Sequence, residues 1–409
     1  MVDVWRARAA QIYPSDLRRS GAPAPPTPLF CRKVLLMTQV LSRRALNRAT
    51  LDRQLLLRRS EFSVIDAVEH LVGLQAQTPH TWYVGLWSRL TGFVPEQAAH
   101  LLTDRKLIRI ALMRSTLHLV TPDDARALRP LIQPVLDRDL YRNHTHGKPI
   151  EGIDMAKLIA DGIELLAPKP LTNKQLGALL GQRWPDRAPT SLVYAIRNQV
   201  PLVQVPPRGV WGRSGPIAHT TADAWLGTEQ TITASLEQMI LRYLAAFGPA
   251  SVKDMQMWSG LTRLREIVDR IRPGLMVFQD QHGQELFDLP DAARPDPDTP
   301  APPRFLYDFD NVLLSHADRT RVITDEYGRQ GYRTQRPAPQ ILLVDGFTAG
   351  DWTINRNTGS ATIHIRPYER PFTTHDAAAV TEEAHALLAF TDPESQTRNV
   401  ILDRPRQQA

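Results

Sequence analysis

Two glutamines stand two residues apart in the segment His70-Leu-Val-Gly-Leu-Gln75-Ala-Gln77-Thr-Pro-His80. A carboxamide does not titrate near neutral pH, but it can hold a water molecule by hydrogen bonds and turn its carbonyl dipole toward a developing positive charge. A glutamine pair after a helix is more often solvated or part of a cap. Whether Gln75 and Gln77 can act on one target depends on the backbone between them.

The elements on either side of the pair predict that this backbone is extended. A helix over Ser63–Gly73 with one buried face is predicted by the spacing of its apolar residues Val64, Ile65, Val68, Leu71 and Val72. Pro79 moves the residue before it out of the α region, so the helix should end near Gly73 or Leu74. Residues i and i+2 point about 200° apart in a helix but the same way in an extended segment. If the two glutamines act together, QAQTP is extended.

Composition and charge point to a multi-domain protein with nucleic acid as the first partner to consider. The chain has 409 residues and 42% hydrophobic content, enough for about two to four compact units. The net charge is +6, and only seven of the 49 basic residues are lysines. The arginine guanidinium can form paired hydrogen bonds with phosphate oxygens and with the edge of guanine. The alternative is a high-GC genome that encodes arginine at ordinary surface positions.

Several classes of protein are excluded or disfavoured. The single cysteine, Cys31, excludes a disulfide framework, a cysteine-held zinc site and an iron–sulfur cluster. No run of 18 apolar residues and no secretion-signal centre occur, so we expect a cytoplasmic protein without membrane contact. No P-loop, GxSxG, HExxH or dinucleotide-binding fingerprint stands in a supporting context. We expect neither a metal nor a cofactor.

Three helices followed by a hairpin recur along the chain, a pattern typical of winged-helix units. In the front section we predict helices at Leu51–Leu57, Ser63–Gly73 and Pro95–Thr103 and strands at Ile108–Met113 and Leu117–Val120. The next section has helices at Met155–Leu166, Thr172–Trp184 and Pro189–Gln199 and a strand at Leu202–Val205. The third has helices at Ala234–Phe247, Val252–Trp258 and Leu261–Ile271 and strands at Leu275–Phe278 and Glu285–Asp288. The last has strands at Gln340–Val344 and Ala361–Ile365 and a closing helix at Asp376–Phe390.

We therefore predict an α+β protein of tandem winged-helix (helix-turn-helix) units with a small β-rich C-terminal region. The expected parts are a disordered arm or mis-assigned start (1–36), a winged-helix-like domain carrying the QAQ motif (37–150), a second winged helix (151–230), a third (231–290), a Pro-rich linker (291–303), and a β-rich domain with a closing helix (304–409).

The chain resembles a known family at several motifs. The run GLQAQTP, Trp87, RSTLHLV followed by TPDD, and YDFDNVLLSHADRTR resemble the bacterial winged-helix DNA glycosylases that confer azinomycin resistance or unhook interstrand crosslinks. The resemblance covers most of Leu41–Phe390. It implies tandem winged helices and a Gln-x-Gln or Gln-x-Asp catalytic motif, which falls on Gln75 and Gln77. It also implies excision of N7-alkylated guanine, with bulky natural-product adducts favoured over methyl lesions, and a role in self-resistance.

Five further side chains could contact DNA near the motif or on a wing. Arg114, Thr116 and His118 alternate along a short strand or turn, although a lone histidine before a β run is more often structural. Trp211 and Arg213 lie on a predicted hairpin that could enter a groove. For Trp211, packing under its own hairpin is the equal alternative.

The segment YDFDNVLLSHADRTR holds the remaining candidates. His316, Arg319 and Arg321 form a basic cluster, for which the resemblance favours phosphate binding. Asp308 and Asp310 could suggest a metal or a carboxylate pair, but their apolar and aromatic neighbours favour structural anchoring. Neither aspartate is taken as a metal ligand.

A winged-helix transcriptional regulator without catalytic activity is the alternative function. The length of the chain, the differences among its wings and the lack of an obvious dimerisation helix weigh against it. A relative that binds lesions without cleaving is a third possibility, against which the intact Gln75 and Gln77 argue. In each case we expect a nucleoid-associated monomer whose partner is double-stranded DNA, carrying alkylated purines if the protein is a glycosylase.

Overall fold

A six-stranded sheet carries the strand of the glutamine pair. The computed structural model describes residues 39–228, 232–329 and 340–405, and the order of strands in this sheet is β2-β4-β3-β6-β7-β5. The strands are β2 (Leu74–Gln75), β3 (Ile108–Ala111), β4 (Leu117–Val120), β5 (Leu171–Thr172), β6 (Leu202–Gln204) and β7 (Ala218–Thr221). β3 and β6 are antiparallel, with Ile110 opposite Val203. The sections predicted as the first and second units thus share one sheet.

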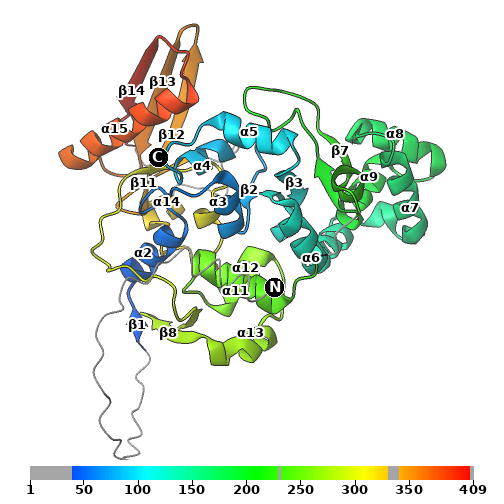
Figure 1. Cartoon of the computed structure of the whole chain (residues 1–409), viewed down its shortest axis with the longest axis horizontal. Helices are drawn as coiled ribbons and strands as arrows, with labels where there is room; N and C mark the ends of the chain where they lie inside the picture. The colour runs from blue at the N-terminus through cyan, green and yellow to red at the C-terminus, as the bar shows by residue number, and fades with distance from the viewer. Residues whose placement is uncertain (1–38, 229–231, 330–339, 406–409) are drawn as a thin grey trace, which may run out of the picture. The chain divides into compact units, whose positions relative to one another are not determined.

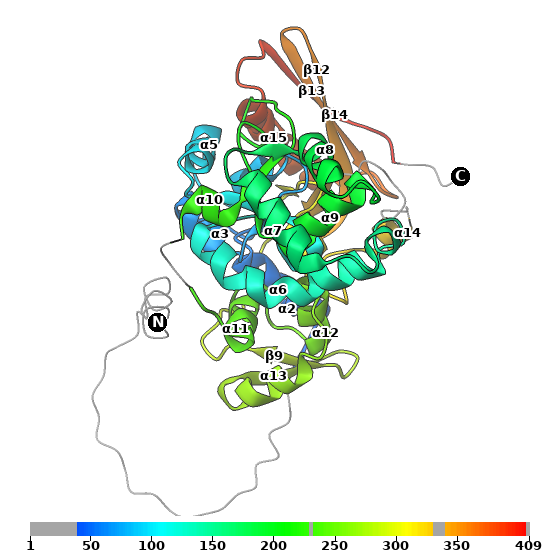
Figure 2. The ribbon, with the colours of Figure 1, turned by 90° about the vertical axis from the view of Figure 1, so that its right-hand side faces the viewer.

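The helices of the second and third sections lie close to their predicted positions (Figures 1 and 2). The second section has α7 (Met155–Leu166), α8 (Asn173–Arg183) and α9 (Pro189–Gln199). The third has α11 (Leu236–Phe247), α12 (Val252–Ser259) and α13 (Arg265–Ile271), followed by the antiparallel strands β8 (Met276–Asp280) and β9 (Glu285–Asp288). Local signals explain the agreement, since Thr172 and Gln175 form a capping box at the start of α8.

The first helix is displaced from its prediction. α2 spans Arg43–Arg53 rather than Leu51–Leu57. It begins where the side chain of Ser42 caps the first turn, and it ends before Leu55, whose φ of 57° lies in the left-handed region. The preceding strand β1 (Val40–Leu41) pairs in parallel with β8, so the start of the described chain joins the sheet of the third section.

A long helix was not predicted. α6 spans Pro122–Arg142 and begins with Thr121 as its N-cap and a proline in its first turn. Pro130 and Pro134 lie inside it, and each removes a backbone donor that an α-helix normally uses. Tertiary packing compensates, because α6 is buried along the side that contacts α9. Figure 2 shows α6 in cyan below α7 and α9.

The C-terminal section is a five-stranded sheet with a helix, as predicted in outline. Its strands, in order, are β10 (Arg304–Phe305), β11 (Gln340–Val344), β12 (Phe347–Asn357), β13 (Ser360–Pro367) and β14 (Thr397–Leu402). α15 (Thr374–Thr391) connects β13 to β14, which run parallel. Its apolar side packs on the sheet and on the section that carries Gln75. The remaining helices are α3 (Val64–His70), α4 (Trp82–Trp87), α5 (Pro95–Thr103), α10 (Ala222–Leu226) and α14 (Asp325–Arg329).

Several arginines are buried and form ion pairs inside the fold. Arg53 on α2 is 1% exposed and forms an ion pair of 2.6 Å with Asp288 at the end of β9. Arg89, after α4, forms an equally buried ion pair with Asp310, at 2.7 Å. The arginine surplus therefore does not translate directly into a basic surface, and the charge argument for nucleic acid is weaker than composition suggested.

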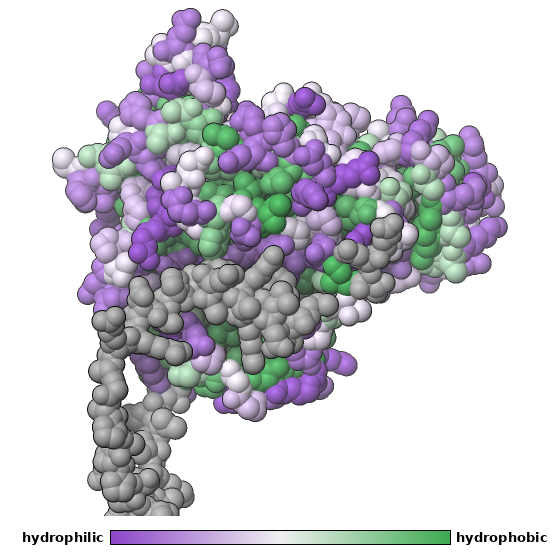
Figure 3. Space-filling model, viewed as in Figure 1, coloured by the Kyte–Doolittle hydropathy of each residue, from purple (hydrophilic) through white to green (hydrophobic). Residues whose placement is uncertain are grey.

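The described chain forms one compact unit without a membrane-spanning helix among the described residues. Residues 38–409 cluster as one unit, and the prediction for residues 1–36 lies outside the described part of the chain. Within the described residues, every helix is too short or too polar to cross a bilayer. On the face in Figure 3, hydrophobic side chains lie in small groups between hydrophilic ones.

Candidate functional site

The glutamine pair lies where a short strand ends, and the expectation of an extended QAQTP is met only in part: β2 covers Leu74–Gln75, and the chain bends at Gln77 and Thr78. The helix ends at His70, and Gly73, with a φ of 88°, turns the chain into β2. Gln75 lies opposite His118 on β4, and the Ala76 nitrogen donates to the Leu117 oxygen at 2.7 Å. Gly73 is required here, since a Cβ would lie 2.6 Å from Val120.

Both glutamine side chains are held by the same turn. Gln75 is 4% exposed, and its Oε1 accepts a hydrogen bond of 2.7 Å from Nη2 of Arg114. Gln77 is exposed, and its Oε1 accepts a bond of 3.2 Å from the backbone nitrogen of Leu117. The segment from Arg114 to Leu117 therefore organises the pair.

That turn has an unusual backbone. Arg114 and Ser115 have φ of 56° and 58°, a left-handed conformation that costs about 1–2 kcal/mol for a residue other than glycine. Side-chain contacts hold it: Arg114 Nη1 donates to the Trp258 oxygen at 2.5 Å, and Ser115 Oγ donates to Asp139 at 2.9 Å. Strained non-glycine residues that are fixed by their surroundings are common at functional sites.

Two side chains distant in sequence hold the QAQ segment from its other sides. Asn311 Nδ2 donates to the Gly73 oxygen at 2.8 Å, and Asn311 Oδ1 accepts from the Gln75 nitrogen at 3.4 Å. Arg109 Nη2 donates to the Ala76 oxygen at 2.7 Å. Burial lowers the pKa of Arg109 to about 10, which leaves it charged at neutral pH. Sequence reasoning assigned no role to Arg109 or Asn311.

The aspartates of the DFDN motif are structural anchors, as predicted. The two carboxylate oxygens of Asp308 accept hydrogen bonds from the hydroxyls of Thr78 and Thr81, at 2.5 and 2.6 Å. Asp310 pairs with Arg89 in the core. Among the described residues, no group of three or more metal-binding side chains is present. Asp308 thus fixes the residue that follows Gln77.

His118 is too deeply buried to contact DNA, which corrects its prediction. It is 2% exposed, and its Nδ1 lies 2.9 Å from the Thr116 oxygen. Burial, aided by the charge of Arg114, lowers the pKa of His118 to about 3, so the ring is neutral. Thr116 is half-buried, and its hydroxyl donates to the Met113 oxygen at 2.9 Å.

The two wing candidates differ in exposure. Trp211 is half-buried, with its ring 4.9 Å from that of Tyr83 and 5.7 Å from that of Phe390. Trp211 is therefore a packed side chain, as the alternative held, but its ring packs on α4 and α15 and not under its own hairpin. Arg213, two residues further along the loop between β6 and β7, is exposed.

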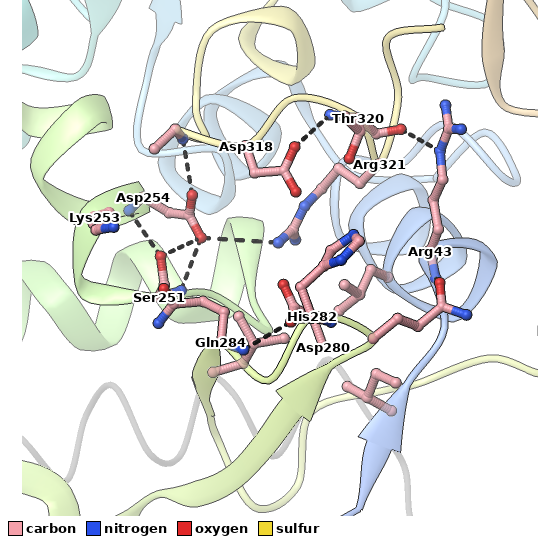
Figure 4. A pocket seen from close by; sticks show the side chains of 15 residues that line it. Arg43, Ser251, Lys253, Asp254, Asp280, His282, Gln284, Asp318, Thr320 and Arg321 are labelled. Atoms are coloured by element: carbon pink, nitrogen blue, oxygen red, sulfur yellow. Dashed lines mark hydrogen bonds and ion pairs between the residues drawn. The ribbon is translucent and has the colours of Figure 1, made fainter. Parts of the chain in front are cut away.

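The basic cluster in SHADRTR is mostly buried, which corrects a second expectation. Figure 4 shows Arg321 of this cluster beside Asp254. Arg321 is 5% exposed; it lines an open cavity of about 440 Å³ and lies 3.8 Å from Asp254. His316 is 1% exposed, and burial lowers its pKa to about 3. Asp254 also accepts from the Ala317 nitrogen at 2.8 Å. His316 therefore packs on α11, where its Nε2 lies 3.1 Å from the Phe247 oxygen, while Arg321 lies beside α12, and neither offers charge to phosphates; Arg319 remains half-exposed.

Two comparisons relate the chain to known proteins. A family model described as DNA glycosylase AlkZ-like matches residues 68–390. Among solved structures, the Streptomyces sahachiroi DNA glycosylase AlkZ superposes with a TM-score of 0.74 at 21% identity, over 89% of this chain and all of that one. At that identity the superposition shows a shared fold. A search of curated proteins found no match.

Proposed function

The chain belongs to the AlkZ-like DNA glycosylase family, and from this premise we propose that it hydrolyses the N-glycosidic bond of N7-alkylated guanines in double-stranded DNA. Gln75 and Gln77 are the proposed catalytic residues. The observation that supports this assignment best is the anchoring of both side chains by one strained turn, with Gln77 open to solvent.

The chemistry suits neutral amides. Alkylation at N7 makes guanine cationic and a good leaving group, so the enzyme has only to place water and stabilise an oxocarbenium-like sugar. Each glutamine oxygen has two lone pairs, and the turn engages one of them. The other can accept a hydrogen bond from water. Because the motif contains no lysine, a Schiff-base lyase step is not expected, and the enzyme is monofunctional.

We further propose that the three-helix sections are winged helices, with two departures from the expected boundaries: the first and second sections share one sheet, and β1 pairs with the sheet of the third section. Thr116, Arg213 and Arg319 are the proposed DNA-contacting residues, because each is exposed or half-buried. Arg114 and Trp211 are also half-buried, but the guanidinium of Arg114 is engaged by Trp258 and Gln75, and the ring of Trp211 packs on Tyr83 and Phe390. Bulky natural-product adducts are the proposed substrates, with interstrand crosslinks as a second substrate and self-resistance as the role. Such a protein acts at the nucleoid, as a monomer.

The third section weighs against the regulator alternative. If it is a winged helix, α13 is its recognition helix. Yet Arg270 pairs with Glu237 at 2.5 Å, and Arg272 pairs with Glu285 at 2.6 Å. Arg270 on α13 and Arg272 directly after it would each have to leave an ion pair to read bases in a groove.

The proposal is tested with duplexes that differ only at one guanine, which is unmodified, N7-methylated, or carries an N7-mustard or a bulky intercalator adduct. We expect release of the alkylated base above the spontaneous rate, no release of unmodified guanine, and binding that depends little on sequence. No release from any adduct, together with tight binding to one undamaged sequence, would favour the regulator.

A further inference from the structure

The chemistry of the hydrogen-bond partners determines which end of each amide faces away from the turn. A guanidinium has only donors, so the Gln75 atom that lies 2.7 Å from Nη2 of Arg114 is the amide oxygen. A backbone N–H is also only a donor, so Gln77 turns its oxygen toward the Leu117 nitrogen. In both side chains, the N–H2 group is the end directed away from the turn.

Arg114 is suited to fix this orientation. Its planar fork spans two acceptors, with Nη1 on the Trp258 oxygen at 2.5 Å and Nη2 on Gln75. A lysine ammonium is a single point charge and has no such plane. Its backbone is also backed closely by Gly260, where a Cβ would lie 3.3 Å from the Cα of Arg114. Arg114 is therefore fixed both at its backbone, by Gly260, and at the terminal nitrogens of its side chain.

We propose that Arg114 is a positioning residue for base release, and that it makes Gln75 a hydrogen-bond donor to the departing purine. This inference rests on the proposed glycosylase function. When the bond between C1′ and N9 breaks, its electron pair moves onto the cationic purine, which leaves as a neutral base. Water adds to C1′ and releases a proton to solvent. Electron density rises on the acceptor atoms of the purine, where an N–H donor stabilises the transition state.

Replacing Gln75 with its isosteric acid tests the donor role. Gln75→Glu keeps an oxygen for Arg114 and nearly the same volume, but its carboxylate has no N–H to offer. We expect the single-turnover rate of base release to fall at least about tenfold, to the level of Gln75→Ala. If Gln75 serves only as an acceptor that holds water, Gln75→Glu will retain or exceed the wild-type rate, and the donor assignment is wrong.

Substitutions of Arg114 test its positioning role. We expect Arg114→Met to lower kcat at least about tenfold with KM within about threefold of wild type, and Arg114→Lys to recover part of the rate. In a Gln75→Ala background, Arg114→Met should cause no further loss, because the side chain that it orients is gone. Arg58→Met, at a side chain that is 89% exposed, is the matched control and should leave the rate unchanged.

Failure of the positioning role and failure of the proposed glycosylase function give different results. A second loss of the same size for Arg114→Met in the Gln75→Ala background would mean that Arg114 supports the fold and not Gln75, which overturns the positioning role. Absence of base release by the wild-type protein would instead reject the proposed function. Unfolding midpoints of all variants, measured alongside, identify any that fail to fold, and Gln75→Glu tests the donor role without changing the turn.

Discussion

Substitution of Gly260 should disturb the glutamine pair from a distance. Gly260 ends α12 with a φ of 82°, and a Cβ there would lie 2.9 Å from Val135 Cγ1 and 3.3 Å from the backbone nitrogen of Arg114. Gly152 is a matched control, since its φ is 70° but a Cβ would meet nothing within 4 Å. Both alanine variants lose stability because alanine is strained at a positive φ. Only in Gly260→Ala would the new Cβ also contact the Arg114 turn.

The expected magnitudes follow from these contacts. A left-handed alanine costs about 1–2 kcal/mol of stability at either position. Overpacking against Val135 and Arg114 adds about 1–3 kcal/mol at Gly260. If the Arg114 turn moves to relieve the contact, Gln75 moves with it, and base release should slow at least about tenfold, which corresponds to about 1.4 kcal/mol.

Two assays on the same preparations decide the outcome. Denaturant unfolding should show a larger loss of unfolding free energy for Gly260→Ala than for Gly152→Ala. Single-turnover release of N7-methylguanine should be slowed only by Gly260→Ala. Equal stability losses and equal rates for the two variants would refute the claim that the packing at Gly260 maintains the geometry of the turn.

Two further predictions concern the supports of the site. Asp308→Asn removes the charge that both threonine hydroxyls face, so two charge-assisted hydrogen bonds become neutral ones; we expect unfolding free energy to fall by about 1.5–3 kcal/mol in a denaturant titration, with slower base release. Burial lowers the pKa of His118 to about 3 and that of His219 to about 4, so both rings are neutral in the folded protein and gain a proton on unfolding below their ordinary pKa of about 6.5. Stability should therefore be highest above pH 6.5 and fall toward pH 4, and His219→Gln should reduce that slope; a slope equal to that of wild type would contradict the assignment.

Local signals predicted much of the secondary structure. Caps and prolines act on neighbouring residues, which is why α7 and α9 were predicted with their observed bounds. α6 was missed because Pro130 and Pro134 oppose a helix locally, while the packing that permits it comes from α9. The pairing of β3 with β6 and of β1 with β8 joins segments far apart in sequence, and no local pattern encodes it.

In the functional site too, features set by neighbouring residues were predicted and features set by distant residues were not. The end of the helix before Gly73 and the strand at Gln75 followed from helix periodicity and Pro79, both nearby, whereas the bend at Gln77 and Thr78 was not predicted. The anchors Arg109 and Asn311 come from distant positions, and only the YDFDN motif signalled that its region matters. The DNA-contact predictions for His316 and Arg321 were wrong, because residue type alone does not show whether a basic side chain is exposed or satisfies a buried carboxylate.

The most direct test of the account is the single-turnover rate of base release from a duplex with one N7-alkylguanine. It is measured for wild type, Gln75→Ala and Gln77→Ala, with Gln182→Ala as a control at an exposed glutamine on α8. The account predicts a loss of at least about tenfold for each member of the pair and none for the control. Release that is equally fast in all four proteins would show that the glutamine pair is not the catalytic site.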